Sequence, residues 1–298
     1  MTDAAADAPV PGGFNEYGRL RRVALRRPAD AFVDRARIKA QWRRLNYHAA
    51  PDLAAAKREF DTLVELLESL DVAIDFLPGY ADLSLDSLYV HDATVVAPDG
   101  LILCNMGKPA RTREPAVNGH HLEELGWTIA GEIAGAGRLE GGDLVWLDAK
   151  TVAVGRGYRS NDAGFRQLKH LLGPEIEIKV CDLPHYKGPD DVFHLMSILS
   201  PLDHDLALVY SPLMTVAFRD WLRHRGLELI EVPDAEFATM ATNALALGPR
   251  HALVLDGNPE TRRRLAAAGV QVEVIQGAEI SAKGEGGPTC LTRPLIRE

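Results

Sequence analysis

Residues 66–78, LLESLDVAIDFLP, lead from the end of a helix-like pattern into a short strand-like pattern, and this succession occurs five times in the chain. The other four copies are LEELGWTIAGEI (122–133), LKHLLGPEIEIKV (168–180), LRHRGLELIEVP (222–233) and LAAAGVQVEVIQG (265–277). Successive copies are about 43 to 55 residues apart. A unit that returns at such an interval indicates a repeat architecture, in which each unit buries its apolar face against its neighbours.

Two of the predicted helices have clear sequence patterns. The first follows Pro51, and its apolar residues recur at helical spacing. These residues are Phe60, Leu63, Val64, Leu67 and Leu70. The last predicted helix has Asn258 at its N-cap and Pro259 at its first position, and both residue types are favoured there. The strand that follows alternates, and one of its faces is made of Val270, Val272 and Val274.

Short apolar runs between the copies predict additional strands. They are ATVVA (93–97), LILCNM (101–106), DLVWLD (143–148), TVAVG (151–155), LALVY (206–210), ALALG (244–248) and HALVLD (251–256). Each unit is therefore expected to run strand, strand, helix, strand, and five such units can bury their apolar faces by packing around one axis. We predict a single α/β domain over residues 14–298, preceded by a flexible tail at residues 1–13. The alternative is an open, doubly wound α/β sheet.

The composition excludes several classes of protein. The 298 residues are 46% hydrophobic and 25% charged, with a formal net charge of -9, as in soluble globular proteins. No apolar run reaches the roughly 18 residues of a membrane span, and the first residues lack the basic and apolar regions of a secretion signal. The chain is acidic and has no block of lysine or arginine, which argues against a nucleic-acid partner. We therefore expect a cytoplasmic protein that binds neither nucleic acid nor membrane.

The three cysteines differ in their surroundings. Their number is odd and no CxxC pair is present, which argues against a disulfide framework and a thiolate zinc site. Cys104 and Cys181 lie in or beside apolar strand patterns, as buried inert cysteines do. Cys290 lies in GEGGPTCLTRP (284–294), where glycines permit a tight backbone and Pro288 stiffens the turn. Cys290 is therefore a candidate nucleophile, and an inert buried thiol is the alternative.

A cysteine nucleophile needs a partner that transfers protons. His194 lies in the apolar run VFHLMSIL, directly after the loop LPHYKGPDD. A histidine in such a place is desolvated and oriented, which suits general acid and base chemistry. The alternative is a histidine of the core.

Carboxylates and arginines complete the set of candidates. Glu140 precedes two glycines and a strand in RLEGGDLVWLD, and Asp86 and Asp92 flank an apolar segment in DLSLDSLYVHDATVV. Arg111 and Arg159 lie in loops beside strands, where an arginine can bind a carboxylate through two parallel hydrogen bonds. Solvated turns, caps and surface arginines are the alternatives. Together the residues suit a guanidinium held by carboxylates, an amino-acid carboxylate held by arginine, and attack by cysteine on the central carbon.

Four motifs in this order, LEGGD, RSN after a strand, FHLMS and GGPTC near the C-terminus, resemble the guanidino-modifying enzymes of the pentein superfamily. Within that group the chain is most similar to dimethylarginine dimethylaminohydrolase. The resemblance extends from NEYGRLRRVALRRP to GGPTCLTRPL and so covers nearly the whole chain. It implies a five-bladed α/β propeller of pseudo-fivefold ββαβ units, which agrees with the five copies.

The resemblance also implies roles for single residues. Cys290 matches the nucleophile, His194 the general acid and base, and Glu140 a carboxylate that binds the guanidinium. The remaining matches are the acidic residues Asp92, Asp86 and Glu285 and the arginines Arg111 and Arg159, which hold the amino-acid end of the substrate.

The implied reaction is hydrolysis of a guanidino C–N bond of N-methylated arginine through a covalent thiouronium on cysteine. It gives citrulline and an alkylamine and requires neither a metal nor an organic cofactor. The chain departs from some relatives at His91, where they have an acidic residue, and from arginine deiminases at Met196, where they have aspartate. Arginine deimination or dihydrolysis, amidino transfer and a non-catalytic binding protein of the same fold are the alternatives. The partner is expected to be a small guanidino substrate, and a homodimer is left open.

Overall fold

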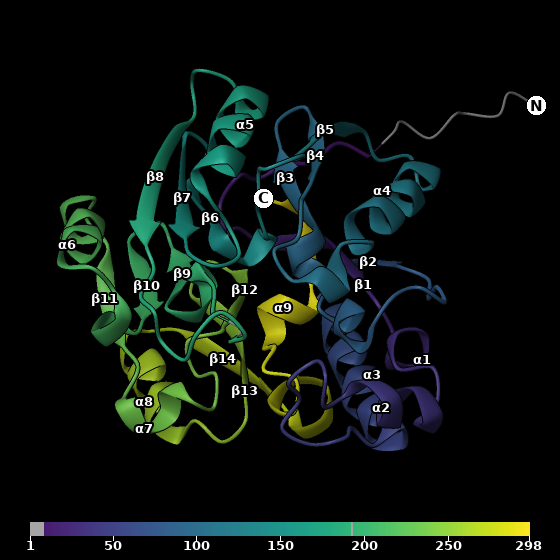
Figure 1. Ribbon diagram of the computed structural model, residues 1–298. Coiled ribbons are helices and arrows are strands. Elements are labelled where there is room, and N and C mark those ends of the chain that lie inside the picture. Colours follow the sequence, from purple (N-terminus) through teal and green to yellow (C-terminus); the bar gives the residue numbers. More distant parts are fainter. Residues whose placement is uncertain (1–8, 192) are drawn as a thin grey trace, which may run out of the picture.

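The computed structural model describes residues 9–191 and 193–298, which form five three-stranded sheets joined by helices (Figure 1). The first sheet contains β1 (Leu20–Leu25), β2 (Ala73–Phe76) and β15 (Arg293–Arg297). The second and third contain β3 (Thr94–Ala97), β4 (Gly100–Leu103) and β5 (Ile129–Glu132), and β6 (Leu144–Asp148), β7 (Thr151–Arg156) and β8 (Glu177–Asp182). The last two contain β9 (Leu199–Asp203), β10 (Leu206–Val209) and β11 (Glu228–Glu231), and β12 (Leu245–Gly248), β13 (His251–Leu255) and β14 (Gln271–Ile275).

Every sheet has the same pairing. An antiparallel pair of strands is followed by a parallel pair, and a helix connects the two parallel strands. These helices are α3 (Leu53–Ser69), α4 (Glu114–Glu124), α5 (Asp162–Leu172), α6 (Val216–His224) and α8 (Pro259–Ala267). The predicted order of strand, strand, helix and strand is confirmed, and a single open sheet is not what forms. The short helices α1 (Pro28–Ala31), α2 (Arg35–Gln41), α7 (Asp234–Phe237) and α9 (Pro288–Leu291) lie outside this pattern.

The sheets contact one another in a closed ring. β15 contacts β3, β9 contacts β12, and β12 contacts β1. The indole of Trp146 on β6 donates a hydrogen bond of 3.1 Å to the carbonyl of Val96 on β3, and one apolar cluster joins β6 and β7 to β9 and β10. Because β15 pairs with β1, the two ends of the chain share one sheet and close the ring. In Figure 1 the sheets follow one another around the centre of the molecule.

The five copies are visible in the sequence because each helix ends in the same way. The first or second residue after each crossover helix has a positive φ, which lets the chain turn back into the next strand. These residues are Asp71 (59°), Gly126 (92°), Gly173 (81°), Gly226 (88°) and Gly269 (78°). Four are glycines because that conformation costs an L-residue energy, and Asp71 is the exception.

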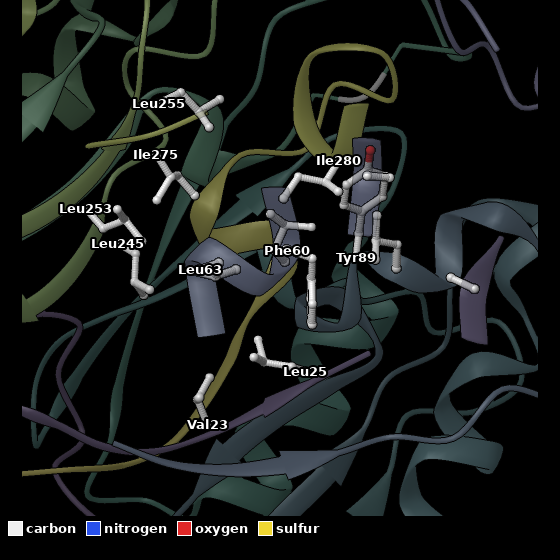
Figure 2. Close-up of a cluster of buried hydrophobic side chains, with 14 of the residues drawn as sticks. Val23, Leu25, Phe60, Leu63, Tyr89, Leu245, Leu253, Leu255, Ile275 and Ile280 are labelled. Carbon is white, nitrogen blue, oxygen red and sulfur yellow. The ribbon is translucent and has the colours of Figure 1, made fainter. Parts of the chain in front are cut away.

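Helix α3 packs its apolar face into a cluster of buried side chains from the first and last sheets (Figure 2). Phe60, Leu63 and Leu67 are fully buried, as the helical spacing predicted, whereas Val64 is only half-buried. The cluster includes Leu25 of the first sheet and Leu253 of the last, so α3 ties these two sheets together. Burying a side chain of this size contributes about 1.5–3 kcal/mol, which makes this face a main source of stability.

The start of α8 was predicted correctly, but its capping contact was not. Asn258 stands at the N-cap position and Pro259 begins the helix, yet the Asn258 side chain accepts no hydrogen bond from the first turn. Its amide instead donates to the carbonyls of Thr239 and Leu255. The carboxylate of Glu236 replaces it and accepts hydrogen bonds of 2.8 Å from the first-turn backbone N–H groups of residues 260 and 261.

The predicted tail at residues 1–13 falls partly outside the described residues, which begin at residue 9. Gly12 forms a bridge with Ile296 and accepts a hydrogen bond of 3.0 Å from the backbone N–H of Arg297. Among the helices in the described part of the chain, none is both long and apolar enough to span a membrane.

Candidate active site

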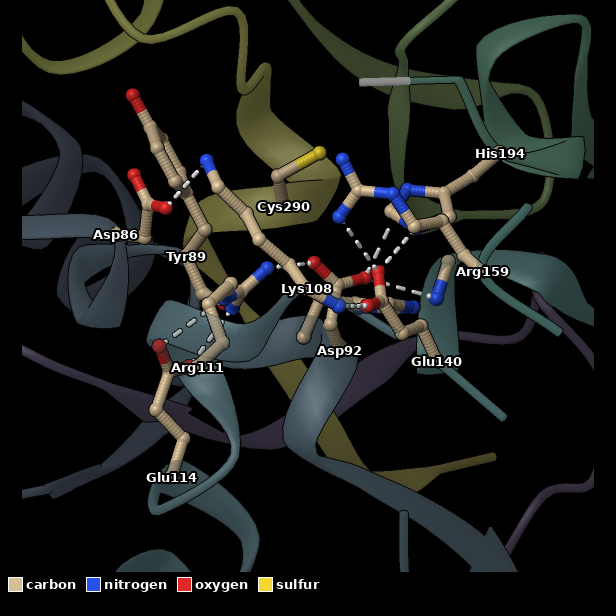
Figure 3. Close-up of polar contacts among 12 residues, drawn as sticks. Asp86, Tyr89, Asp92, Lys108, Arg111, Glu114, Glu140, Arg159, His194 and Cys290 are labelled. Carbon is tan, nitrogen blue, oxygen red and sulfur yellow. Dashed lines mark hydrogen bonds and ion pairs between the residues drawn. The ribbon is translucent and has the colours of Figure 1, made fainter. Parts of the chain in front are cut away.

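Four segments from different parts of the chain bring the predicted catalytic residues together (Figure 3). Cys290 lies on α9, and Asp92 lies in a helical turn at Val90–Ala93. Glu140 and His194 directly precede the turns Gly141–Asp143 and Leu195–Ser197. Helix α9 contacts the turn Val90–Ala93, and that turn contacts the turn Gly141–Asp143. The turn Gly141–Asp143 in turn contacts Leu195–Ser197. Each of these four residues therefore lies in a short helical segment or directly before one.

Cys290 is half-buried and has a neutral thiol in the free protein. Its sulfur accepts a hydrogen bond of 3.3 Å from Asn243 Nδ2. Burial, with the negative charge of Asp92, raises the pKa of the Cys290 thiol to about 12. By contrast, Cys104 and Cys181 are buried in apolar clusters, and burial raises the pKa of both thiols. Cys290 is thus the cysteine that is open to a ligand, and the other two match the prediction of inert thiols.

The glycines before Cys290 are required by close packing. A Cβ atom at Gly286 would overlap the ring of Tyr89, and one at Gly287 would overlap the amide of Asn243. The Asn243 Oδ1 atom also accepts a hydrogen bond of 3.0 Å from the backbone N–H of Thr289. The backbone of this turn is therefore held against neighbouring side chains, which fixes the position of the thiol.

His194 is positively charged at neutral pH. Its Nε2 lies 2.7 Å from Glu140 Oε2, and its Nδ1 lies 4.0 Å from Asp92 Oδ1. Burial alone would lower the pKa of His194, but Asp92, Asp143 and Glu140 outweigh it and raise that pKa to about 9. The ring is only 4% exposed, so it holds a proton in a place that solvent barely reaches.

Glu140 is fully buried and ionised. One carboxylate oxygen accepts hydrogen bonds from the backbone N–H groups of Gly107 (2.8 Å) and Lys108 (3.1 Å). The other faces His194 and lies 3.5 Å from Arg159 Nη1. Burial raises the pKa of Glu140, but His194 and Arg159 outweigh burial and hold it below its usual value. Glu140 therefore fixes His194 in its charged form.

Asp92 belongs to a second ionic cluster. Its Oδ1 accepts a hydrogen bond of 2.9 Å from the backbone N–H of Gly142, and its Oδ2 accepts one of 2.5 Å from Arg111 Nη1. Arg111 also donates to Glu114 at 3.0 and 2.8 Å and to the carbonyl of Tyr89 at 2.6 Å. The Asp92 pKa is well below its usual range because His194 and Arg111 outweigh the effect of burial. Arg111 lies in the site as predicted, but most of its N–H groups bind protein acceptors.

The other predicted binding residues are also in polar contact. Asp86 lies 2.6 Å from the ammonium of Lys108, and Arg159 donates a hydrogen bond of 3.1 Å to the carbonyl of Asp191. Glu285 is partly exposed and lies 3.0 Å from Nε2 of His48. Glu285 has a φ of 59°, a conformation that tight turns impose on non-glycine residues at a cost.

Two cavities meet at the catalytic residues, because Cys290, His194 and Glu285 line both. We call the first the charged cavity; it is also lined by Asp86, Tyr89, Asp92, Lys108, Arg111, Arg159, Gly284 and Gly286. The second is the aromatic cavity; it is also lined by Tyr186, Phe193, Met196, Phe237, Met240, Asn243, Ala238, His91, Ser197, Gly142, Lys187 and Asp191. Every predicted site residue except Glu140 lines the charged cavity, and Glu140 lies behind His194.

Four residues that support the site were not predicted. Lys108 and Glu114 flank Arg111 in the motif GKPARTREP, and that density of charge was the only hint. Asp143 was considered as a solvated residue but is fully buried; burial raises its pKa to about 6, and it accepts hydrogen bonds from Ser160 Oγ and the backbone N–H of residue 195. Asn243 carries no hint in the sequence, because its contact with Cys290 arises only from the fold.

Asp92, Glu140 and His194 are close enough to share a metal ion, since their possible ligand atoms all lie within 4.8 Å of one another. The carboxylate oxygens, however, already accept hydrogen bonds from Arg111 and from backbone N–H groups. A second such group, Asp203, His204 and Asp205, lies on the surface and is paired with Arg250.

Comparison with known proteins gives the relatives of the chain. A sequence model of N,N-dimethylarginine dimethylhydrolases, described as eukaryotic, matches residues 32–297. The protein YkgA of Bacillus subtilis is 30% identical over 95% of this chain and 94% of its own length. An arginine deiminase of Rhodococcus jostii is 27% identical over 76% of this chain, which spans only 62% of that deiminase.

The fold is shared with solved structures. A cysteine-to-serine mutant of the dimethylarginine dimethylaminohydrolase of Pseudomonas aeruginosa, complexed with citrulline, superposes with a TM-score of 0.74 at 22% identity. The match covers 92% of this chain and 99% of that one. The chain therefore belongs to the N,N-dimethylarginine dimethylhydrolase family, within the guanidino-modifying enzymes of the pentein superfamily.

Proposed function

We propose that the protein hydrolyses a guanidino C–N bond of N-methylated arginine, with Cys290 as nucleophile, and releases citrulline and an alkylamine. The observation that carries this proposal is that Cys290 and His194 line the same two cavities, beside buried carboxylates. We also propose that the ring of sheets is a five-bladed α/β propeller and that residues 14–298 form one domain around it.

The charged cavity suits an amino acid that carries an additional cation. Asp92 lines this cavity with Cys290, where a guanidinium would approach the sulfur, and Glu140 adds negative charge behind His194. Arg159 and Lys108 offer positive charge to an α-carboxylate, and Asp86 offers negative charge to an α-amino group. Arginine and its N-methylated forms contain all three of these groups.

The pKa values of Cys290 and His194 define the order of proton transfers. In the free protein Cys290 is a thiol and His194 an imidazolium, because their pKa values are raised to about 12 and about 9. A bound guanidinium adds positive charge beside the sulfur and favours the thiolate, and because His194 is already protonated, the thiol proton leaves to solvent. The thiolate then attacks the guanidino carbon and gives a tetrahedral adduct.

His194 acts in both halves of the reaction. It donates its proton to the departing amine as the C–N bond breaks, which leaves a thiouronium on Cys290. The neutral ring then accepts a proton from water, which attacks the same carbon. The C–S bond breaks, the ureido product leaves, and the thiolate and imidazolium return. Glu140 contributes by keeping the ring oriented and charged.

The second candidate is deimination of arginine itself, which the arginine deiminase relative favours. Amidino transfer to an amine would use the same thiouronium with a different acceptor, and a non-catalytic binding protein would use the cavities alone.

A substrate panel tests the proposal. Arginine, monomethylarginine and both dimethylarginines are incubated singly, with and without glycine, and the products are identified by mass spectrometry. Citrulline with methylamine or dimethylamine supports the proposal. Ammonia from arginine alone supports deimination, guanidinoacetate supports transfer, and no product from any substrate contradicts catalysis.

A further inference from the structure

We propose that the aromatic cavity binds an apolar substituent on the departing nitrogen of the guanidine, and that the preferred substrate is an arginine whose terminal nitrogen carries a substituent larger than methyl. This inference rests on the proposed function and adds the class of substrate. It starts from the two cavities, which share Cys290, His194 and Glu285 but otherwise have different walls. If the charged cavity holds the amino-acid end, the aromatic cavity lies on the other side of the attacked carbon.

The walls of the aromatic cavity are suited to an apolar group. The rings of Tyr186 and Phe193 are 5.8 Å apart, and the rings of Tyr186 and Phe237 are 5.9 Å apart. Phe237 in turn stacks on Tyr210 at 3.9 Å, so the aromatic wall has a fixed backing. Met196 adds an adaptable thioether side chain. An apolar substituent that covers these groups gains from the removal of apolar surface from water.

The charges in this cavity do not favour a second cation. Its acidic residues are Glu285 and Asp191, and Lys187 lies 3.6 Å from Glu285 and 4.0 Å from Asp191. Glu285 also lies beside His48. The charged cavity, by contrast, contains Asp86 and Asp92. A neutral substituent is therefore the better match for the aromatic cavity.

The reaction with such a substrate balances as for methylarginine. The Cys290 thiolate forms a bond to the guanidino carbon, and the bond from that carbon to the substituted nitrogen breaks. The departing primary amine takes the proton of His194. Water then attacks the carbon, the C–S bond breaks, and citrulline leaves.

The test compares kcat/KM for arginines with methyl, ethyl, propyl and benzyl groups on one terminal nitrogen. Each buried methylene is expected to raise kcat/KM by about fourfold, so propyl should exceed methyl by about 16-fold. A kcat/KM that is flat or falls from methyl to propyl overturns this inference alone, provided that methylarginine is hydrolysed. If no member of the panel is hydrolysed, the proposed function itself is wrong.

A cavity variant locates the effect. Ala238 is exposed and lines the aromatic cavity but not the charged one. Ala238→Phe should reduce the propyl-to-methyl ratio of kcat/KM to about one, because its ring occupies the space of the substituent. Ala267→Phe, at an exposed position of α8, is the matched control and should retain the ratio. An Ala238→Phe ratio equal to that of the unsubstituted protein contradicts the assigned cavity.

Discussion

Two buried ionic clusters support the cleft around Cys290, and they differ in whether they contain a group that can release a proton. In the Arg111 cluster, formed by Asp92, Arg111 and Glu114, guanidinium and backbone N–H groups occupy both oxygens of Asp92, and the pKa of Asp92 is held well below its usual range. In the His194 cluster, formed by Glu140, Arg159 and His194, the ring carries a proton with a pKa of about 9. The first cluster can hold groups in place, whereas the second can also move a proton.

Of the substitutions in the two clusters, that of His194 is expected to reduce turnover most. His194→Ala removes both the acid and the base, so turnover should fall by about 10⁴-fold. Mass spectrometry of Cys290 then shows whether the adduct fails to form or accumulates. His204→Ala, at an exposed histidine, is the control and should keep its activity. Turnover of His194→Ala within tenfold of the parent protein would exclude the assigned role.

Glu140→Gln should have the next largest effect. The neutral amide no longer stabilises the imidazolium, so kcat/KM should fall by about 100-fold and the pKa of His194 should decrease. The pH profile and an NMR titration of His194 measure both quantities. Glu124→Gln on the surface of α4 is the control. An unchanged kcat/KM would remove Glu140 from the mechanism.

The pH dependence of the unaltered protein should show the ionisation of His194. kcat/KM follows the free protein, in which the thiolate fraction of Cys290 rises about tenfold per pH unit and the protonated fraction of His194 falls about tenfold per pH unit above about 9. kcat/KM should therefore rise up to about pH 9 and level off above it. The raised pKa also stabilises the fold: this contribution is complete below the unfolded pKa of about 6.5 and is lost as the pH rises through about 9. A kcat/KM that goes on rising about tenfold per pH unit from pH 9 to 10.5 would contradict a charged His194.

Glu114→Gln should affect activity least, because it changes the cluster that only positions groups. Its loss leaves Arg111 partly unpaired in a buried place, so the free energy of unfolding should fall by about 3 kcal/mol. KM should rise more than kcat falls, and the break in the pH profile of kcat/KM near pH 9 should stay in place. Denaturant unfolding and the pH profile measure these effects. A shift of that break would show that the two clusters are not separable.

Most of the fold could be predicted because each repeat has sequence patterns that depend only on neighbouring residues. The helix ends at Gly126, Gly173, Gly226 and Gly269 and the alternating strands after them depend on neighbours in sequence. Strands β1, β9 and β15 were not predicted, although β15 closes the ring. β15 has the sequence RPLIR and lies at the edge of its sheet, where a proline is tolerated, but two arginines are untypical of a buried strand. Its burial depends on the whole ring, which no local pattern reveals.

The site was predictable to the extent that single residues stand in unusual surroundings. Cys290 among glycines and His194 in an apolar run have that property, and both line the cleft. The contact of Asn243 with the sulfur and the pairing of Glu114 with Arg111 and Asp92 connect residues through space. Such contacts also decide which arginine is engaged by the protein and which is open to a substrate, so they could not be derived from residue types alone.

The most direct test of the account is the rate of citrulline formation from monomethylarginine by Cys290→Ser, compared with the unaltered protein and with Cys181→Ser. Cys290→Ser should produce no measurable citrulline, because a serine hydroxyl beside His194 lacks the nucleophilicity of a thiolate. Cys181→Ser, at a buried cysteine of β8, should retain turnover if it folds, which circular dichroism verifies. Appreciable citrulline formation by folded Cys290→Ser would contradict covalent catalysis at this residue.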